Sequence, residues 1–362
     1  MMKLLTDFLL FVFFISFFTC CKNTGDDVYM AFDNVVYISK FPKEIQLNKV
    51  DPMDVDLMGA VDLFAQDSIV IFKYYNMDYF WGVFTVDSFL NKGYYLSKGH
   101  GPDEFSSLPS NEYFANDGGI CQFWDSGQNK MYNININSTL DNGILNIDTV
   151  IDLKIKSYAH NCVQMDDSTY FVVQGSGNSQ HRSLLISGVF HELEYLQPLN
   201  DVKVQNNLNT ISGVRVCNKN KHIVVEGMLY LNQLNLYSLK SDTINKTICV
   251  GDKLSNVATI DKASKKQWKR YYGPIIVTDE YFAALYYNSS YEDFLRGNMK
   301  KVDVQFFDLK GNPMLNISVP YSVTGFFIHR NKHLYVLSIK GEVERIYKYD
   351  ISQVLQNVLK KT

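Results

Sequence analysis

The chain has 362 residues, of which 46% are hydrophobic and 20% charged, so it can bury a large core and is not a disordered protein. Its 35 lysine and arginine residues and 38 aspartate and glutamate residues leave a formal net charge of −3, which excludes the basic surface typical of nucleic-acid-binding proteins. The 24 tyrosines and 24 phenylalanines, against 8 prolines, favour β-strands.

The N-terminus has the features of a lipoprotein leader. Lys3 precedes an apolar run, Phe8–Phe18, which is too short to span a bilayer as a helix and suits the core of a signal peptide. The cysteines that follow, Cys20 and Cys21, resemble the cleavage site of bacterial lipoproteins. We expect lipidation at Cys21, with Cys20 as the alternative. An ordinary cleaved signal peptide or a short anchor is the other interpretation of this segment.

One pattern recurs along the rest of the chain: a polar turn followed by an apolar strand. The copies begin at Asp67, Asp117, Asp167, Asn220, Asp279 and Asn331, at intervals of 50 to 59 residues. In the last copy, two strands of alternating residues flank the turn Lys340-Gly341, which is the signature of a β-hairpin. The even spacing indicates one structural unit repeated six times.

Each copy predicts about four strands, the first of which lies before the polar turn. Four antiparallel strands repeated radially form the blades of a β-propeller. We therefore predict an all-β fold, a six-bladed β-propeller of four-stranded antiparallel blades, in residues 34–362. Residues 1–20 would be the lipoprotein signal peptide and residues 21–33 a flexible tether. A pair of β-sandwiches is the alternative, against which the even spacing argues.

The propeller hypothesis makes further predictions about individual strands. The first strands, nearest the axis, should be the most apolar, and the outer strands the most polar. Closure of the ring should use Asn34–Ile38 or Ile45–Asn48 as a strand beside Ile346–Asp350. The lysine-rich interval at residues 252–272 is expected to contain a short helix. Three segments are predicted to lie in or near leading strands: Ile151–Ile155, Val214–Cys217 and Gly325–His329.

A glycine-rich loop follows the first copy of the repeat. The segment Leu96–Phe105 reads LSKGHGPDEF, in which Gly99, Gly101 and Pro102 demand special backbone angles. This segment resembles the Gly-x-Gly-Pro-x-Glu-Phe loop of the TolB-like six-bladed β-propeller lipoproteins of Gram-negative anaerobes. Together with the leader and the repeat, the resemblance covers the whole mature chain. It implies a propeller in the cell envelope, and it implies no particular catalytic residues.

The loop has a structural and a functional interpretation. In the structural one, the glycines and Pro102 shape a sharp turn, Glu104 accepts backbone N–H bonds, and Phe105 fills the space between two blades. In the functional one, the loop lies at the mouth of the central channel and offers His100, Asp103 and Glu104 to a ligand.

Catalytic and cofactor motifs are missing from the sequence. It contains no HExxH, no phosphate-binding P-loop and no GxSxG nucleophile elbow. The four cysteines of the mature chain form no CxxC pair, which argues against a metal site and favours buried thiols; they are Cys121, Cys162, Cys217 and Cys249. We expect no cofactor and no metal.

Two functional hypotheses follow. In the first, the protein is a lipid-anchored binding or scaffold module in the envelope of a Gram-negative bacterium, at the outer membrane, with an envelope protein, a peptide or a glycan as its ligand. In the second, it is a propeller enzyme, a lyase or hydrolase, with its site at the mouth of the central channel. Binding is favoured because the sequence offers no catalytic signature.

Overall fold

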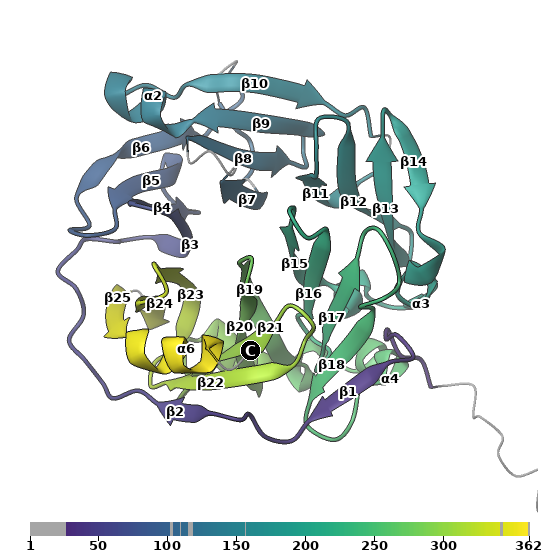
Figure 1. The fold of residues 1–362 in the computed structure, drawn as a ribbon. Coiled ribbons are helices and arrows are strands. Elements are labelled where there is room, and N and C mark those ends of the chain that lie inside the picture. Colours follow the sequence, from purple (N-terminus) through teal and green to yellow (C-terminus); the bar gives the residue numbers. More distant parts are fainter. Residues whose placement is uncertain are drawn as a thin grey trace, which may run out of the picture.

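The computed structural model describes residues 27–101, 104–108, 110–114, 119–155, 157–340 and 343–360. The strands of these residues form six sheets that surround a central axis as the blades of a propeller (Figure 1). The predicted all-β, six-bladed propeller is thereby confirmed, with four-stranded antiparallel blades in most of the sheets. The lipoprotein leader and the tether up to residue 26 lie outside the described residues and stay predictions.

The blades follow the chain in order, each from its innermost to its outermost strand. Blade 1 contains β3 (Ala60–Gln66), β4 (Ile69–Tyr74), β5 (Tyr79–Thr85) and β6 (Asn91–Ser97). Blade 2 contains β7 (Ser110–Phe114), β8 (Ile120–Asp125), β9 (Lys130–Asn135) and β10 (Ile147–Asp152). Blade 3 contains β11 (Ala159–Gln164), β12 (Thr169–Ser176), β13 (Ser179–Ile186) and β14 (Val189–Glu192).

In the second half of the ring, blade 6 differs from the other blades in its number of strands. Blade 4 contains β15 (Gly213–Asn218), β16 (Ile223–Met228), β17 (Leu234–Ser238) and β18 (Lys246–Val250). Blade 5 contains β19 (Lys269–Val277), β20 (Tyr281–Ser290), β21 (Val302–Asp308) and β22 (Pro313–Val319). Within the described residues, blade 6 has three strands, β23 (Val323–His329), β24 (His333–Lys340) and β25 (Val343–Asp350).

The recurring polar turns mark the same position in the blades. Within the described residues, they join the innermost strand to the second strand, as Asp67 does between β3 and β4 and Asn331 between β23 and β24, whereas Asp117 lies outside the described residues. Asp67 (φ 51°) and Asn331 (φ 53°) both adopt the left-handed backbone conformation, which aspartate and asparagine tolerate better than other residues with a side chain. The left-handed conformation therefore accounts for the residue type at these two turns, whereas Asp167, Asn220 and Asp279 do not adopt it.

The prediction that the first strands are the most apolar is wrong. All six residues of the second strand β16 are buried, whereas only Arg215 and Asn218 are buried in the innermost strand β15. The innermost strands line an axial cavity, while the second strands are packed between neighbouring blades on both faces. Val214–Cys217 and Gly325–His329 lie in the innermost strands β15 and β23, as predicted, whereas Ile151–Ile155 lies at the end of the outermost strand β10 and before β11 rather than in an innermost strand.

Residues 27–58 form an N-terminal strap that runs around the outside of the ring (Figure 1). Its strand β1 (Val35–Ile38) pairs in parallel with β18, and its strand β2 (Glu44–Gln46) pairs in parallel with β22. Farther along the strap, the backbone N–H of Met53 donates to the carbonyl of Ile346 in blade 6 (2.9 Å). The strap therefore covers the outer edges of blades 4 and 5, which would otherwise expose unpaired backbone groups.

The predicted closing strand beside Ile346–Asp350 is consequently wrong for both candidate segments, which pair with blades 4 and 5 instead. The ring closes through the packing of side chains between blades 1 and 6. Blade 1 residues such as Phe72 and Phe89 share a core with Tyr335 and Ile346 of blade 6, and the Phe89 and Tyr335 ring centroids lie 5.7 Å apart. Burial of apolar surface between blades 1 and 6 thus stabilises the closed ring, in which a shared strand was expected to join the two ends.

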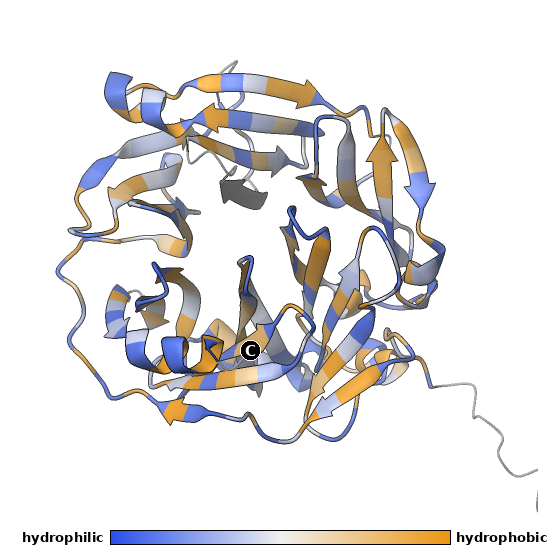
Figure 2. Ribbon diagram, viewed as in Figure 1, coloured by the Kyte–Doolittle hydropathy of each residue, from blue (hydrophilic) through white to orange (hydrophobic). Residues whose placement is uncertain are grey.

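The hydrophobic core is divided among the interfaces between blades. Apolar residues recur in every blade (Figure 2), and at the interface of blades 1 and 2, Trp81 packs edge-on against Phe123 with ring centroids 5.3 Å apart. Helices are short and peripheral: α2 (Ile136–Asn142), α3 (Gln197–Asn200), α4 (Val257–Lys262), α5 (Tyr291–Leu295) and α6 (Ser352–Leu359). Helix α4 confirms the helix predicted within residues 252–272. In the described ranges, no helix combines the length and apolar character that crossing a bilayer requires.

Candidate functional site

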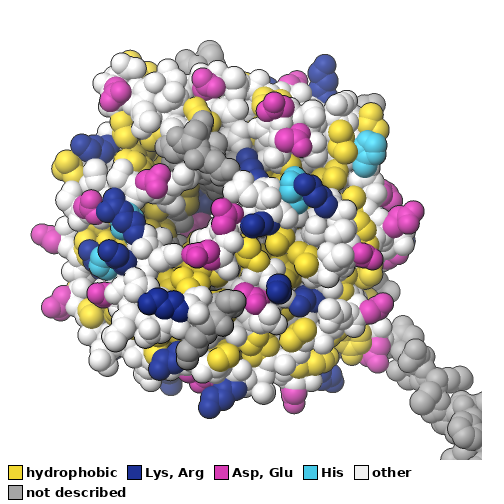
Figure 3. Space-filling view, in the orientation of Figure 1, with side chains coloured by type: hydrophobic (Ala, Val, Ile, Leu, Met, Phe, Trp, Pro, Cys, Tyr) yellow, Lys and Arg dark blue, Asp and Glu magenta, His cyan; other side chains and the backbone are white. Residues whose placement is uncertain are grey.

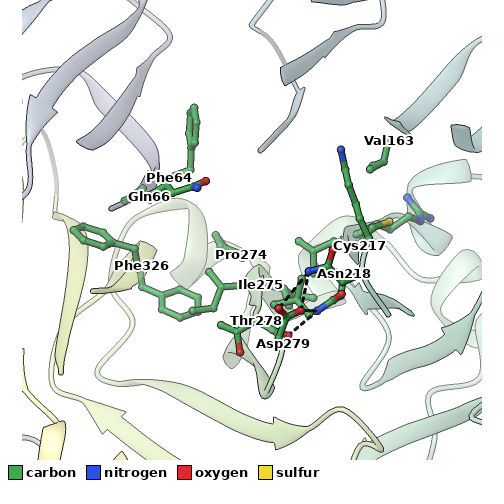
Figure 4. A pocket seen from close by; sticks show the side chains of 18 of the residues that line it. Phe64, Gln66, Val163, Cys217, Asn218, Pro274, Ile275, Thr278, Asp279 and Phe326 are labelled. Atoms are coloured by element: carbon green, nitrogen blue, oxygen red, sulfur yellow. Dashed lines mark hydrogen bonds between the residues drawn. The ribbon is translucent and has the colours of Figure 1, made fainter. Parts of the chain in front are cut away.

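A cavity of about 410 Å³ lies on the propeller axis (Figure 4). Its walls come from the innermost strands of five blades and from the turns that follow two of them: Leu63–Gln66, Val163, Arg215–Asn220, Pro274–Asp279, Phe326 and Phe327. Because these are the final residues of β3, β15 and β19 and the first residues of the turns after β15 and β19, the cavity lies toward the end of the ring where innermost strands turn back.

One side of the cavity is apolar and the other is polar. Phe64 of blade 1 and Phe326 of blade 6 lie across the cavity from Asn218 of blade 4 (Figure 4). The Asn218 side-chain amide donates to the carbonyl of Thr278 (2.8 Å) and to Asp279 Oδ1 (3.0 Å), so it joins the polar turns of blades 4 and 5. The shape of the polar side is therefore fixed by contacts between blades.

A buried triad of charged side chains, Arg182, Arg215 and Glu226, lies behind the polar side of the cavity. Glu226 of β16 accepts two hydrogen bonds from Arg182 of β13, from Nη2 to Oε1 (2.6 Å) and from Nε to Oε2 (2.8 Å). Arg215 of β15 contacts the same carboxylate through Nη2 (2.5 Å to Oε1). The side chains of Arg182 and Glu226 are fully buried, and Arg215 is 6% exposed. Two guanidinium groups thus face one carboxylate in the wall between blades 3 and 4.

The triad fixes the charge of Glu226. Burial raises the pKa of this carboxyl group, but the attraction of the Arg182 and Arg215 guanidinium groups outweighs burial and lowers the pKa to about 2. The Tyr237 hydroxyl donates to Glu226 Oε2 (3.3 Å) and completes its environment. At neutral pH the triad therefore carries an excess positive charge beside the cavity.

Lys219 adds a second cation to the cavity wall. It follows β15 by one residue, and its Nζ donates to Gln122 Oε1 of blade 2 (3.1 Å). Gln122 in turn donates to Gln164 Oε1 of blade 3 (2.6 Å), so a polar network connects blades 2, 3 and 4. Burial lowers the pKa of Lys219 to about 8. Lys219 thus remains mostly charged at neutral pH in a partly desolvated position.

The glycine-rich loop lies elsewhere. It connects the outermost strand β6 to the innermost strand β7, at the end of the blades opposite to the turns that follow the innermost strands. His100 and Glu104 are exposed, and neither lines the cavity. Pro102 and Asp103 lie outside the described residues, as do Cys20 and Cys21. The structure does not bring the described ligand candidates of the loop into the cavity, and their role in binding stays a prediction.

The described part of the loop is bound to itself and to the two flanking blades. The Gly101 N–H donates to Glu104 Oε2 (2.8 Å), and the Glu104 N–H donates to the carbonyl of Gly101 (3.2 Å). Phe105 is 2% exposed, and its ring centroid lies 5.6 Å from that of Phe123 and 5.2 Å from that of Tyr132, both in blade 2. The loop thereby anchors an aromatic side chain in the core between blades 1 and 2.

We expect the stability of the loop to require glycine at position 99, because the Glu104 side chain lies beside it. A Cβ at Gly99 would overlap the Glu104 carboxylate, so Gly99→Ala should displace that side chain and break its bond to Gly101. We expect a loss of about 1 kcal/mol of unfolding free energy, the usual contribution of one hydrogen bond. Chemical denaturation of Gly99→Ala, Glu104→Ala and the double variant measures it.

The double variant is the control. Gly99 has a φ of 156°, so alanine there carries a backbone cost with or without Glu104. Once Glu104 is alanine, only the cost of the overlap is removed, which gives a coupling energy of about 1 kcal/mol between the two positions. Additive losses would contradict the contact between them.

The residues around the cavity were not singled out from the sequence, because they belong to no motif. The signal that would have found two of them is a charged residue inside an apolar strand: Arg215 in GVRVCN and Glu226 in IVVEGM. A charge that is held in such a strand must be paired or must face a cavity. Of the described residues, no three His, Cys, Asp or Glu side chains gather as a metal site would require. The four described cysteines form no disulfide with one another.

No protein-family model matches the chain, and no curated protein was found to resemble it in sequence. Solved structures do resemble it in fold. A member of the DUF4221 family from Bacteroides vulgatus aligns with a TM-score of 0.50 at 12% identity, over 82% of this chain and 94% of that one. A Bacteroides fragilis protein named as an exported protein aligns with a TM-score of 0.50 at 11% identity, over 84% of this chain and 88% of that one. The chain therefore shares its propeller fold with proteins from Bacteroides, while membership of the TolB-like family stays a prediction.

Proposed function

We propose that the protein is an exported binding module, lipid-anchored in the cell envelope, whose ligand enters the axial cavity. The observation that carries the proposal is the cavity itself: about 410 Å³, walled by five blades, with aromatic side chains on one side and fixed polar groups on the other. Pockets of this size with a few convergent polar groups are the usual form of small-ligand sites.

The sequence and the fold comparison support the envelope location. The leader with Cys20 and Cys21 is similar to that of a bacterial lipoprotein, and one structural neighbour is named as an exported protein. The face drawn in Figure 3 carries lysine, arginine, aspartate and glutamate side chains interspersed, without a large region of one sign. Such a surface suits recognition through a cavity better than recognition of an extended polyanion.

A variant that fills the cavity tests the proposal. Gln66 lies at the end of β3 and lines the cavity, so Gln66→Trp should obstruct it. Gln46→Trp is the matched control, because Gln46 is exposed on β2 of the N-terminal strap. We expect the wild-type protein and Gln46→Trp to retain the same compound from the soluble glycan or peptide fraction of the envelope, and Gln66→Trp to lose it.

Mass spectrometry of the eluted fractions is the measurement. Equal retention by Gln66→Trp would show that the ligand binds outside the cavity. If the wild-type protein retained nothing from either fraction, the binding function itself would be refuted.

A further inference from the structure

Two cationic residues of blade 4 belong to the cavity wall. Arg215 lies within β15, and Lys219 lies in the turn that follows this strand. Both line the cavity. This part of blade 4 therefore places an ammonium group in the cavity wall, with the Arg215 guanidinium buried behind it against Gln180 and Glu226.

The hydrogen-bonding capacity of Arg215 is incompletely used. Nη2 donates to Gln180 Oε1 (2.6 Å) and contacts Glu226, and Nη1 donates to the carbonyl of Gly213 (3.2 Å). Its Nε is buried and has no hydrogen-bond partner among the described residues. A buried charged donor that lacks a partner is unusual, because its desolvation is uncompensated. This atom is closed off from the cavity, so an anion bound there would be attracted by the charge of Arg215 without contacting its Nε.

The net charge of the cavity wall also favours an anionic ligand. Glu226 offsets only one of the two guanidinium groups of the triad, and Lys219 adds another positive charge. Within the described lining, the one carboxylate is that of Asp279, which already accepts hydrogen bonds from Asn218 (3.0 Å) and Asn220 (3.3 Å). The buried end of the cavity is cationic, and an anion placed there would gain electrostatic attraction in a poorly solvated site.

We propose that the axial cavity binds a small organic oxyanion, in which a carboxylate or phosphate group contacts Lys219 and is attracted by the buried charge of Arg215, and a less polar body faces Phe64 and Phe326. This proposal rests on the proposed function of the cavity and names its ligand class. Arginine and lysine are the side chains that recognise both groups, so the two sources of the anion are separated by experiment.

Calorimetric titration of the purified protein with three hexose derivatives is the test. Glucuronate carries a carboxylate, glucose 6-phosphate carries a phosphate, and glucose carries neither. We expect saturable binding of one or both anions and none of glucose. Preference between glucuronate and glucose 6-phosphate identifies the source. The proposal is overturned if neither anion binds at millimolar concentration or if glucose binds equally well.

Charge removal at Lys219 completes the test. Lys219→Met keeps the length of the side chain without its charge, and it should weaken binding of the anion about tenfold or more, the expected effect of a charge-assisted hydrogen bond. Lys219→Gln serves as a second variant if the first is unstable. Lys221→Met is the matched control, because Lys221 is exposed in the same turn, and its affinity should equal that of the wild type.

Affinity unchanged in both Lys219 variants would also refute the proposal. A compound captured from the envelope that is neutral, and lost in Gln66→Trp, would refute the oxyanion while leaving the binding function intact.

Discussion

Replacing Glu226 by glutamine is expected to lower the unfolding free energy by about 3–5 kcal/mol, the usual effect of removing one partner from a buried ion pair. The carboxylate accepts hydrogen bonds from Arg182 at 2.6 and 2.8 Å and contacts Arg215 at 2.5 Å, and none of the three side chains is more than slightly exposed. In Glu226→Gln, two guanidinium groups would stay buried without a countercharge between blades 3 and 4. Chemical denaturation measures the loss.

Two comparisons make this prediction specific. Glu280→Gln changes the same groups at an exposed position of blade 5, and it should leave stability within about 0.5 kcal/mol of the wild type. Tyr237→Phe removes only the hydroxyl that donates to Glu226, so a loss of about 1 kcal/mol is expected. A loss below that value for Glu226→Gln would contradict the role assigned to the triad.

The pH dependence of stability offers a second measurement of the same group. The folded pKa of Glu226, about 2, lies below the ordinary value for an unfolded glutamate, about 4.3. The unfolded chain therefore binds this proton more readily, so the contribution of Glu226 is present above about pH 4.3 and is lost as the pH falls toward 2. Glu226→Gln should lack this component of the acid unfolding curve.

Phe41→Ala in the N-terminal strap is expected to cost about 3–5 kcal/mol, as large-to-small changes of buried phenylalanines do. Phe41 is 4% exposed, its ring centroid lies 5.5 Å from that of Phe307, and it belongs to a core shared by blades 4 and 5. Loss of this anchor should also weaken the pairing of β1 with β18, because the strap lies against that edge. Denaturation and amide hydrogen exchange measure the two effects.

Tyr37→Ala is the matched control for the strap. Tyr37 lies on β1 and is 50% exposed, so its truncation should cost far less and should leave hydrogen exchange in β18 unchanged. Similar losses for the two variants would show that the strap contributes little to the stability of the ring.

The repeat could be predicted from the sequence because an aspartate or asparagine turn precedes an apolar strand at near-constant spacing. Asp67 and Asn331 take positive φ at this position, which explains the residue type at these two turns. The sequence also predicted that residues 34–38 form a strand, but the strand with which they were predicted to pair was wrong. Alternation of side chains defines a strand and its faces, whereas it does not determine which distant edge the strand will pair with.

The candidate site was harder to predict for a related reason. The loop residues His100 and Glu104 stand out in the sequence as a short polar motif, yet they are exposed and lie away from the cavity. Arg215 and Glu226 are hidden in apolar strands, and only the packing of blade 4 against blade 3 brings them to Arg182. Charges that meet across three strands of two blades leave no local spacing to recognise.

We expect the ligand of this propeller to lie on its axis. A crystal structure of the protein grown with the compound retained from the envelope fraction tests it most directly. We expect ligand density in the axial cavity, with an oxygen of the ligand within hydrogen-bond distance of Lys219 Nζ. Density on the outer surface, for example beside His100 and Glu104, with the cavity empty, would contradict it.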